Sequence, residues 1–302
     1  MKIPPYLQQG DTIAITCPAG FMPLEKAQTC IDTLQQWGYE VLLGKTLGSQ
    51  SKNYFSGTDE VRLNEFQAML DAPEVKAILC GRGGYGVGRI IEQLDFTEFK
   101  KHPKWIIGFS DITVLHAHIN RNYKIATLHA PMAAAFNEGG FKNKYVQSLK
   151  QAIEGKKALY DCKGHSLNQP GSVSGELIGG NLALLAHLVG SSSDIQTKNK
   201  ILFLEDVGEQ HYNVDRMIIQ LKRSGKFRDL AGLIIGGFTD MQDTQRPFGK
   251  KVYQIIKEHI ADFTYPICFG FPVSHDKENL ALKCGATYQL HVEARSVRLS
   301  EV

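Results

Sequence analysis

The 302-residue sequence predicts an α/β protein with two domains. In the first half, short β-type apolar runs alternate with amphipathic helical patterns, which is typical of a mostly parallel sheet covered on both faces. Residues 141–172 hold one short helical pattern followed by polar sequence that contains Lys, Gly and Pro, as expected of a linker. The pattern beyond them is mixed and closes with several short strands, which indicates antiparallel, curled sheet. We therefore predict a first domain over 1–140, a linker, and a smaller mixed α/β domain over 173–302.

Local signals bound the elements of the first domain. The helical pattern at 23–38 ends at Gly38, a residue type that commonly follows the last helical turn. The next helix begins at Thr58, a favourable N-cap, and Pro73 stops it. In chain order, the expected strands are 11–19, 39–44, 75–80, 104–109 and 124–129, and the expected helices are 23–38, 58–73, 86–94 and 111–122.

The second half mixes helices with shorter strands. One short helical pattern lies within the predicted linker, and no internal repeat or low-complexity tract is visible. Apolar runs of strand length recur up to the last residues, which favours more antiparallel pairing than in the first domain. The expected strands are 172–180, 200–206, 230–238, 266–271, 279–285, 287–292 and 296–301, and the expected helices are 181–190, 213–225 and 250–263.

Composition and charge narrow the class of partner. The chain is 43% hydrophobic and 22% charged, which is ordinary for a soluble globular protein. A formal net charge of +3 is close to neutral for this length, and no segment shows the dense Lys/Arg clustering of a nucleic-acid surface. We therefore expect a small molecule or a peptide as the substrate, and no nucleic-acid partner.

The cysteines and the N-terminus predict a cytoplasmic protein without a metal. Six scattered cysteines form no C-x-x-C pair, so neither a zinc site nor a thioredoxin-type motif is expected. Several lie in apolar runs, where a buried free thiol is favoured, and free thiols fit a reducing compartment. The first residues contain no apolar signal-peptide core, and no apolar run approaches the roughly 18 residues that span a bilayer.

Ser110 is the first candidate catalytic residue. It stands in KWIIGFSD, residues 104–111, between the end of a predicted strand and the start of a predicted helix. A serine at such a turn exposes its hydroxyl near the positive end of the helix, where a nucleophile is useful. The alternative is a simple N-cap. The complete G-x-S-x-G elbow is absent, because Ile112 stands where the second glycine would be.

The segment GRGGYG, residues 81–86, has three possible roles. It is formally a G-x-G-x-x-G after a strand, but it is not the first βα unit, and the next strand ends in Ser110 where an NAD site needs an acidic residue. A glycine-rich turn can also serve close backbone packing. Backbone N–H groups in such a turn can hold an anion, including a transient oxyanion. We favour this last role, because both loops leave strand ends at one sheet edge.

Glu205 and His275 could complete a nucleophile–base–carboxylate set with Ser110. Glu205 closes the apolar strand KILFLED, although Asp206 and Glu209 compete for its role. His275 lies in the loop GFPVSHDKEN after another strand. A histidine base activates a serine hydroxyl, and a carboxylate orients the imidazole and stabilises its cation. The spacing along the sequence does not show that the three residues converge.

Seven segments in order resemble the LD-carboxypeptidase family, which includes muramoyltetrapeptide carboxypeptidases and microcin C self-immunity proteins. They are GDTIAITCPAG, GRGGYG, GFSDIT, TLHAPM, GELIGGNLALL, FLEDVGEQHYNVDR and GFPVSHDKENLAL, and together they cover nearly the whole chain. Cys17 departs from the pattern, because a small residue is usual at that position. The resemblance implies a flavodoxin-like N-terminal domain, a smaller C-terminal domain, an active site in the cleft between them, and a homodimer without metal or cofactor.

The resemblance also implies roles for single residues. Ser110 would be the nucleophile, His275 the general base and Glu205 its partner. The backbone N–H groups of Gly84 and Asp111 would form the oxyanion hole. Candidate substrate contacts are Arg82, Asn181 and Arg216. A free terminal carboxylate needs a cation or several donors, but Asn181 suits an N-cap and Arg216 a structural ion pair.

The function implied is hydrolysis of the amide between an L-centre and the C-terminal D-Ala of a murein tetrapeptide, as in peptidoglycan recycling. One alternative within the family is a microcin-type immunity hydrolase that cleaves an aminoacyl-nucleotide conjugate. An aromatic-rich loop that stacks on the base would favour it, and Tyr54 and Phe55 alone do not decide. An alternative from another class is a non-catalytic nucleotide- or sugar-binding module, in which GRGGYG holds a phosphate and Ser110 is only a cap.

Overall fold

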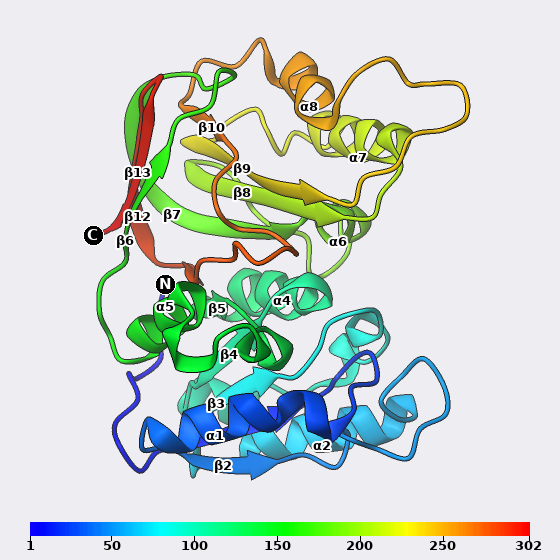
Figure 1. Ribbon diagram of the computed structural model, residues 1–302, viewed down its shortest axis with the longest axis vertical. Coiled ribbons are helices and arrows are strands. Elements are labelled where there is room, and N and C mark those ends of the chain that lie inside the picture. Colours follow the sequence, from blue (N-terminus) through cyan, green and yellow to red (C-terminus); the bar gives the residue numbers. More distant parts are fainter. The chain divides into compact units, whose positions relative to one another are not determined.

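The computed structural model describes residues 1–302, which divide into two compact units. The first unit is Met1–Lys156 with Leu280–Lys283, and the second is Lys157–Asn279 with Cys284–Val302. Each unit is built on one sheet, and Figure 1 shows the two sheets with their helices. The α/β class expected from the sequence is confirmed.

The sheet of the first unit has the strand order β11-β5-β4-β3-β1-β2. Neighbouring strands from β2 to β5 pair in parallel, and the order β2-β1-β3-β4-β5 is that of flavodoxin-like folds. Its strands are β1 (Thr12–Thr16), β2 (Glu40–Leu43), β3 (Val75–Cys80), β4 (Trp105–Gly108), β5 (Thr127–His129) and β11 (Leu282–Cys284).

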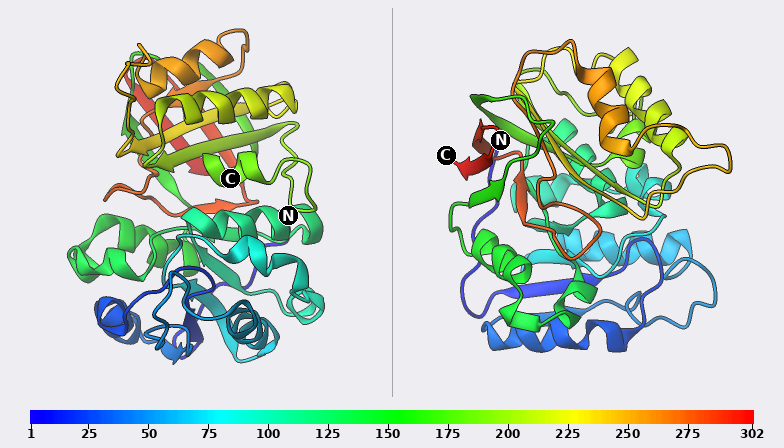
Figure 2. Two further views of the ribbon diagram at one scale, coloured as in Figure 1. Left: turned by 90° about the vertical axis from the view of Figure 1, so that its right-hand side faces the viewer. Right: turned by 45° about the horizontal axis from the view of Figure 1, so that its top comes forward.

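Helices cover both faces of this sheet, because alternate residues of the buried strands point to opposite sides. Ile13 and Ile15 of β1 join one core with α1 and α5, while α2 and α4 pack against β1, β3 and β4. Figure 2 shows these helices around the strands. The helices are α1 (Gln28–Gln36), α2 (Asp59–Asp71), α3 (Thr97–Lys101), α4 (Thr113–Tyr123) and α5 (Lys144–Ile153).

Several boundaries follow from local chemistry. The hydroxyl of Thr58 accepts a hydrogen bond from the backbone N–H of Val61 at 3.2 Å, so the expected N-cap of α2 is present. The helix expected at 86–94 is absent. The structure has two 3-10 turns there, η2 (Val87–Arg89) and η3 (Ile91–Gln93), because glycines within the segment disfavour an α-helix. The stretch 141–172 carries α5 in the first unit and β6 (Leu159–Lys163) in the second.

The sheet of the second unit combines two kinds of pairing in the order β10-β9-β8-β7-β12-β13-β6. Strands β7 to β10 are parallel, whereas β12 pairs antiparallel with β7 and β13, and β13 pairs antiparallel with β6. Its further strands are β7 (Gly171–Asn181), β8 (Lys200–Val207), β9 (Gly232–Thr239), β10 (Ile267–Phe269), β12 (Thr287–Val292) and β13 (Ser296–Glu301).

Three helices follow the parallel strands of this second sheet along the chain. They are α6 (Leu182–His187), α7 (His211–Arg223) and α8 (Val252–Ile260), and α7 lies beside both of the others. Figure 2 shows α7 and α8 running together over one side of the sheet. Their apolar stripes are buried, with Ile218 and Leu221 of α7 and Ile255 and Ile256 of α8 at 0% exposure. None of the helices of the chain has the length and apolar character needed to cross a bilayer.

Candidate active site

Ser110 lies on a strained turn directly after β4. Its φ of 63° is in the left-handed region, which few residues other than glycine adopt. The chain continues through a 3-10 turn, Ser110–Ile112, into α4, and the residue in the N-cap position of α4 is Ile112. The capping role considered for Ser110 is therefore not the one it has. A strained turn of this kind at the end of a buried strand is typical of a serine nucleophile.

The glycine-rich loop packs directly on this turn. A Cβ atom at Gly83 would lie 2.7 Å from the Cβ and 3.0 Å from the Oγ of Ser110, and 3.3 Å from the backbone N of Asp111. No side chain fits at this position, so the backbone of the loop approaches the Ser110 turn as closely as van der Waals radii permit. This closeness is what an oxyanion hole shared between the two loops requires.

The side chain of Asp111 connects the same two loops. It is 1% exposed, and its Oδ2 accepts a hydrogen bond from the backbone N–H of Val87 at 2.8 Å. From the sequence, only the backbone N–H of Asp111 is expected to take part in the site. The position of this acidic residue directly after Ser110 is the only feature of the sequence that could have indicated a role for its side chain. Here it anchors the segment after GRGGYG to the Ser110 turn.

Arg62 is a structural residue of this region that the sequence did not reveal. Its guanidinium is fully buried, forms an ion pair with Asp59, and donates to the carbonyl oxygens of Pro18 at 2.6 Å and Gly86 at 3.0 Å. Burial lowers the pKa of Arg62, and the charge of Asp59 opposes this shift. Nothing in the helical pattern of 58–73 marks this arginine as buried. It joins the loop after β1 to the end of GRGGYG.

Two further sequence candidates lie in the same loop. Arg82 is exposed and donates from Nη1 to the carbonyl oxygen of Phe21 at 2.9 Å, without an acidic partner. A Cβ at Gly84 would lie 2.9 Å from the hydroxyl oxygen of Tyr54, so that tyrosine borders the loop. The remaining donors of Arg82 are available for an anion.

In the second unit, Glu205 and His275 form the closest carboxylate–imidazole pair. The Oε2 of Glu205 lies 2.5 Å from the Nδ1 of His275, and Glu205 is 0% exposed. The second oxygen, Oε1, has no hydrogen-bond partner. Because a carboxylate only accepts, the proton of this bond stays on Nδ1, and Nε2 is the nitrogen that can take up a proton.

The protonation of His275 reflects two opposing effects. Burial disfavours the imidazolium, but the hydrogen bond and charge of Glu205, with a contribution from Asp206, outweigh it, so the pKa of His275 is raised. Stabilisation of the imidazolium is what a general base needs at the moment when it holds the proton.

Two glycines of β9 let the His275 loop lie against that strand. The backbone N–H of Gly237 donates to the carbonyl oxygen of Val273 at 2.9 Å. A Cβ at Gly237 would lie 2.4 Å from the Cβ of Ser274, and one at Gly236 would lie 2.3 Å from the carbonyl oxygen of Val273. The pair of glycines that ends the apolar run of β9 is therefore a packing requirement of the loop that carries the histidine.

Asp206, the competitor of Glu205, has a different role. Its carboxylate accepts from the Nδ2 of Asn181 at 2.7 Å and from the backbone N–H groups of Ala183 at 3.0 Å and Val207 at 2.9 Å. Asn181 also caps α6, because its Oδ1 accepts from the N–H of Leu184 at 3.1 Å. Burial, with the charge of Glu205, raises the pKa of Asp206 to about 7, while these donors oppose the shift.

The last two candidates lie on or before α7. Arg216 is exposed, and its guanidinium lies 5.3 Å from the ring centre of Tyr212, so it stacks on an aromatic ring instead of forming the structural ion pair considered for it. Glu209 accepts from the Nδ2 of Asn213 at 3.0 Å. Of the three acidic residues at or just beyond the end of β8, only Glu205 forms a hydrogen bond with the histidine.

The structure thus builds the candidate site in two parts. The first unit brings together Ser110, Asp111 and the loop of Arg82 and Gly84. The second unit brings together Glu205 and His275, with Asn181 bound to the neighbouring Asp206. One part carries a strained serine beside backbone donors, and the other carries a histidine base with its carboxylate.

Comparison with known families gives a match to each half of the chain. Residues 13–130 match the LD-carboxypeptidase N-terminal domain, and residues 174–290 match the LD-carboxypeptidase C-terminal domain. Each match includes its own part of the candidate site.

Comparison with individual proteins gives relatives of the same kind over nearly the full length. A probable murein peptide carboxypeptidase of Bacillus subtilis is 36% identical over 288 residues, which cover 94% of this chain and 89% of the relative. The crystal structure of a muramoyltetrapeptide carboxypeptidase from Oxalobacter formigenes has a TM-score of 0.87 at 27% identity and covers 96% of this chain and 98% of that one. The microcin C7 self-immunity protein of Escherichia coli is 25% identical over 331 residues, covering 98% and 94% of the two chains.

Proposed function

Because the chain belongs to the LD-carboxypeptidase family, we propose that it is a serine carboxypeptidase of peptidoglycan recycling in the cytoplasm. Its substrate would be a murein tetrapeptide, and the bond cleaved would be the amide between the L-centre of the diamino acid and the terminal D-Ala. The observation that carries the proposal is the buried Glu205–His275 pair, 2.5 Å between Oε2 and Nδ1. The strained turn of Ser110 supplies the matching nucleophile.

The mechanism assigns each group one task. The Nε2 of His275 removes the proton of the Ser110 hydroxyl while Oγ attacks the scissile carbonyl carbon. The resulting oxyanion accepts hydrogen bonds from the backbone N–H groups of Gly84 and Asp111. His275 then gives the proton to the departing amine of D-Ala, which leaves an acyl-enzyme. Water, deprotonated by the same histidine, hydrolyses that ester and restores the serine. The steps require Ser110 Oγ within hydrogen-bond reach of His275 Nε2 during turnover.

Recognition of the terminal carboxylate is assigned to Arg82 in the first place. Its guanidinium is exposed, holds only the carbonyl of Phe21 through Nη1, and has no acidic partner. A planar guanidinium with free donors suits a carboxylate. Asn181 and Arg216 are the further candidates for contact with the substrate. Asn181 already binds α6 and Asp206, and Arg216 stacks on Tyr212.

The same residues support a second candidate, hydrolysis of an aminoacyl-nucleotide conjugate. One observation favours it: Tyr54 and Tyr85 are 57% and 51% exposed, both rings contact that of Phe55, and Tyr54 borders Gly84. Exposed tyrosine rings can stack on a nucleobase. Incubating the enzyme in parallel with a tetrapeptide and with an aminoacyl-sulfamoyl adenosine separates the two candidates, because the preferred substrate is the one with the higher kcat/KM.

The direct test is release of D-Ala from a purified murein tetrapeptide, followed by mass spectrometry. We expect Ser110→Ala to lower kcat by about four orders of magnitude or more with the fold retained by circular dichroism. Ser172→Ala, an exposed serine of β7, is the matched control and should keep full activity. Full tetrapeptide hydrolysis by Ser110→Ala would refute the nucleophile. Binding of nucleotides without hydrolysis of any LD-peptide by the wild type would favour a non-catalytic binding module.

The resemblance also predicts a homodimer. Sedimentation velocity of the purified chain tests it, and a single species at the mass of the monomer across micromolar concentrations would contradict it.

A further inference from the structure

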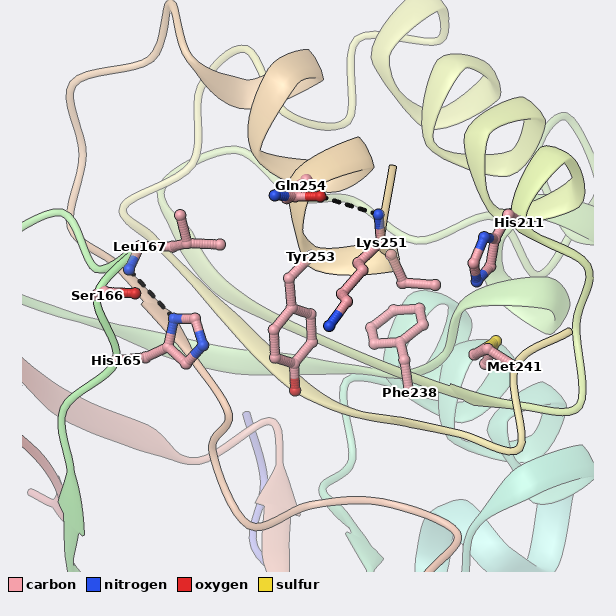
Figure 3. Close-up of a pocket in the computed structure, with 10 residues that line it drawn as sticks. His165, Ser166, Leu167, His211, Phe238, Met241, Lys251, Tyr253 and Gln254 are labelled. Atoms are coloured by element: carbon pink, nitrogen blue, oxygen red, sulfur yellow. Dashed lines mark hydrogen bonds between the residues drawn. The ribbon is translucent and has the colours of Figure 1, made fainter. Parts of the chain in front are cut away.

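A pocket of about 460 Å³ opens in the second unit, and neither Glu205 nor His275 lines it. It lies where β9 ends and where α7 and α8 begin, and the loop after β6 closes one side (Figure 3). Its lining residues are His165, Ser166, Leu167, His211, Phe238, Met241, Lys251, Val252, Tyr253 and Gln254. The volume falls within the range of small-molecule sites in proteins.

The position of the pocket matches where α/β proteins bind ligands. Strands β8, β9 and β10 are parallel, so their carboxyl ends share one edge of the sheet. Phe238 is the penultimate residue of β9, and the pocket opens from that end. Crevices outside the carboxyl ends of parallel strands are the usual ligand sites of open α/β sheets.

The walls of the pocket are aromatic and apolar. The ring of Tyr253 stands edge-on to that of Phe238, with centroids 6.3 Å apart, and to that of His165 at 5.4 Å. The hydroxyl of Tyr253 donates to the carbonyl oxygen of Gly236 at 2.8 Å, which fixes the ring and satisfies its polar end. Met241 and Val252 complete the apolar lining. Such walls offer packing contacts to the apolar body of an organic molecule but few polar contacts to an inorganic ion.

Two of the polar side chains that line this space, Lys251 and His165, offer hydrogen-bond donors. Figure 3 shows the side chain of Lys251 extending from the start of α8 toward Tyr253 and Phe238. Lys251 forms no ion pair, whereas its neighbour Lys250 is paired with Glu258 at 2.5 Å between Nζ and Oε2. The Nδ1 of His165 accepts the backbone N–H of Leu167 at 3.1 Å, so the neutral ring carries its proton on Nε2.

The carboxylate of Asp243, which lies next to the lining residue His211, is hydrogen-bonded within its own loop. The Oδ1 of Asp243 accepts from the backbone N–H groups of Thr244 at 2.8 Å and Phe248 at 3.0 Å. Its Oδ2 lies 3.6 Å from the Nδ1 of His211, another lining residue. The ammonium of Lys251 and the N–H of His165 therefore remain as donors without an anionic partner in the chain.

We propose that this pocket binds a small organic anion, with a carboxylate or phosphate head and an apolar body of aromatic-ring size. The head is held by Lys251 and His165, and the body packs against Tyr253, Phe238 and Met241. This site is separate from the catalytic residues assigned above and does not depend on the proposed function. An ammonium ion and a ring N–H recognise both kinds of head, and the test below distinguishes them.

The test is a titration of the full-length protein followed by amide NMR, with phenylacetate and phenyl phosphate as probes. We expect saturable shifts in residues 165–167, 238–241 and 251–254. Phenylacetamide, which lacks the charge, and acetate and inorganic phosphate, which lack the ring, should bind at least about tenfold more weakly. The tighter of the two charged aromatic probes identifies the preferred head.

Variants of α8 complete the experiment. Lys251→Gln should weaken binding of the charged aromatic probes about tenfold or more, because a charged donor is lost. Lys257→Gln is the matched control, since Lys257 lies on the same helix, forms no ion pair and does not line the pocket. The proposal is overturned if neither charged probe binds at about 10 mM. It is also overturned if phenylacetamide binds as tightly as phenylacetate, or if Lys251→Gln and wild type have equal affinity.

Discussion

At the scale of single residues, the candidate site depends on a few unusual environments. Ser110 has a left-handed backbone, and Glu205 is completely buried with one oxygen bound to His275 and the other without a partner. Each is costly in isolation, since a strained non-glycine turn and a buried carboxylate both oppose folding. Residues kept in such states despite the cost are typical of functional sites.

The raised pKa of His275 predicts the pH dependence of activity. As the general base, His275 must be neutral in the free enzyme, so the acid limb of kcat/KM should lie above the ordinary histidine pKa of about 6.5. Glu205→Gln removes the charge that favours the imidazolium, so it should move this limb to lower pH and reduce kcat on the order of 10⁴-fold. An acid limb that stays in place in Glu205→Gln would show that another group titrates.

The same shift has a consequence for stability. The pKa of His275 is higher in the folded than in the unfolded chain. The protonated His275 therefore stabilises the fold fully at pH values below its unfolded pKa, and this stabilisation is lost as the pH rises through its folded pKa. The unfolding free energy of wild type should therefore exceed that of His275→Gln by more at pH 6 than at pH 9. Urea unfolding followed by far-UV circular dichroism at both pH values measures the difference, and an equal or reversed difference would contradict the shift.

At the scale of elements, the candidate catalytic residues lie in loops after strands or, for Glu205, near the carboxyl end of β8. Glycines let the loops pack closely on their neighbours. Gly83 brings the GRGGYG loop onto the Ser110 turn, and Gly237 brings the His275 loop onto β9. The sequence predicted most of the strands and helices, because their periodicity and caps are local signals. It failed at 86–94, where an apolar periodic pattern contains glycines and the structure forms only 3-10 turns.

Gly83→Ala tests the close approach of the two loops. The added Cβ would lie 2.7 Å from the Cβ of Ser110, so the turn must shift and the backbone donors must move away from the oxyanion position. We expect kcat to fall by about two orders of magnitude, the typical loss for one oxyanion donor. Gly88→Ala is the control, because no atom lies within 4 Å of its added Cβ. Equal activity of the two variants would show that the GRGGYG loop can shift to accommodate the added Cβ without loss of function.

At the scale of the whole molecule, the units are not simple consecutive segments of the chain. Residues 280–283 return to the first unit and place β11 beside β5 at the edge of its sheet. Leu282 is 0% exposed there, and the backbone N–H of the neighbouring Ala281 donates to the hydroxyl of Ser148 at 3.0 Å. The stability of the first unit therefore depends on residues that follow it by more than a hundred positions.

Leu282→Ala should consequently destabilise the first unit by about 2–5 kcal/mol. Both tryptophans, Trp37 and Trp105, lie in that unit, so tryptophan fluorescence reports its unfolding alone. We expect a lower urea midpoint by this probe. Leu159→Ala, whose side chain is 62% exposed in the second unit, should leave the midpoint unchanged. A wild-type midpoint for Leu282→Ala would mean that β11 adds nothing to the first sheet.

The sequence by itself determined the α/β class, most element positions and the candidates at strand ends, because hydrophobic periodicity, caps and strand-to-loop positions are encoded locally. The resemblance pointed to Glu205, but the tertiary structure shows that Glu205 contacts His275 whereas Asp206 binds Asn181, since adjacent residues of a strand point to opposite faces. The tertiary structure alone decided the buried role of Arg62 and the return of β11 to the first sheet. Both features depend on contacts between segments that are distant in the sequence, and local sequence patterns do not encode the energies of such contacts.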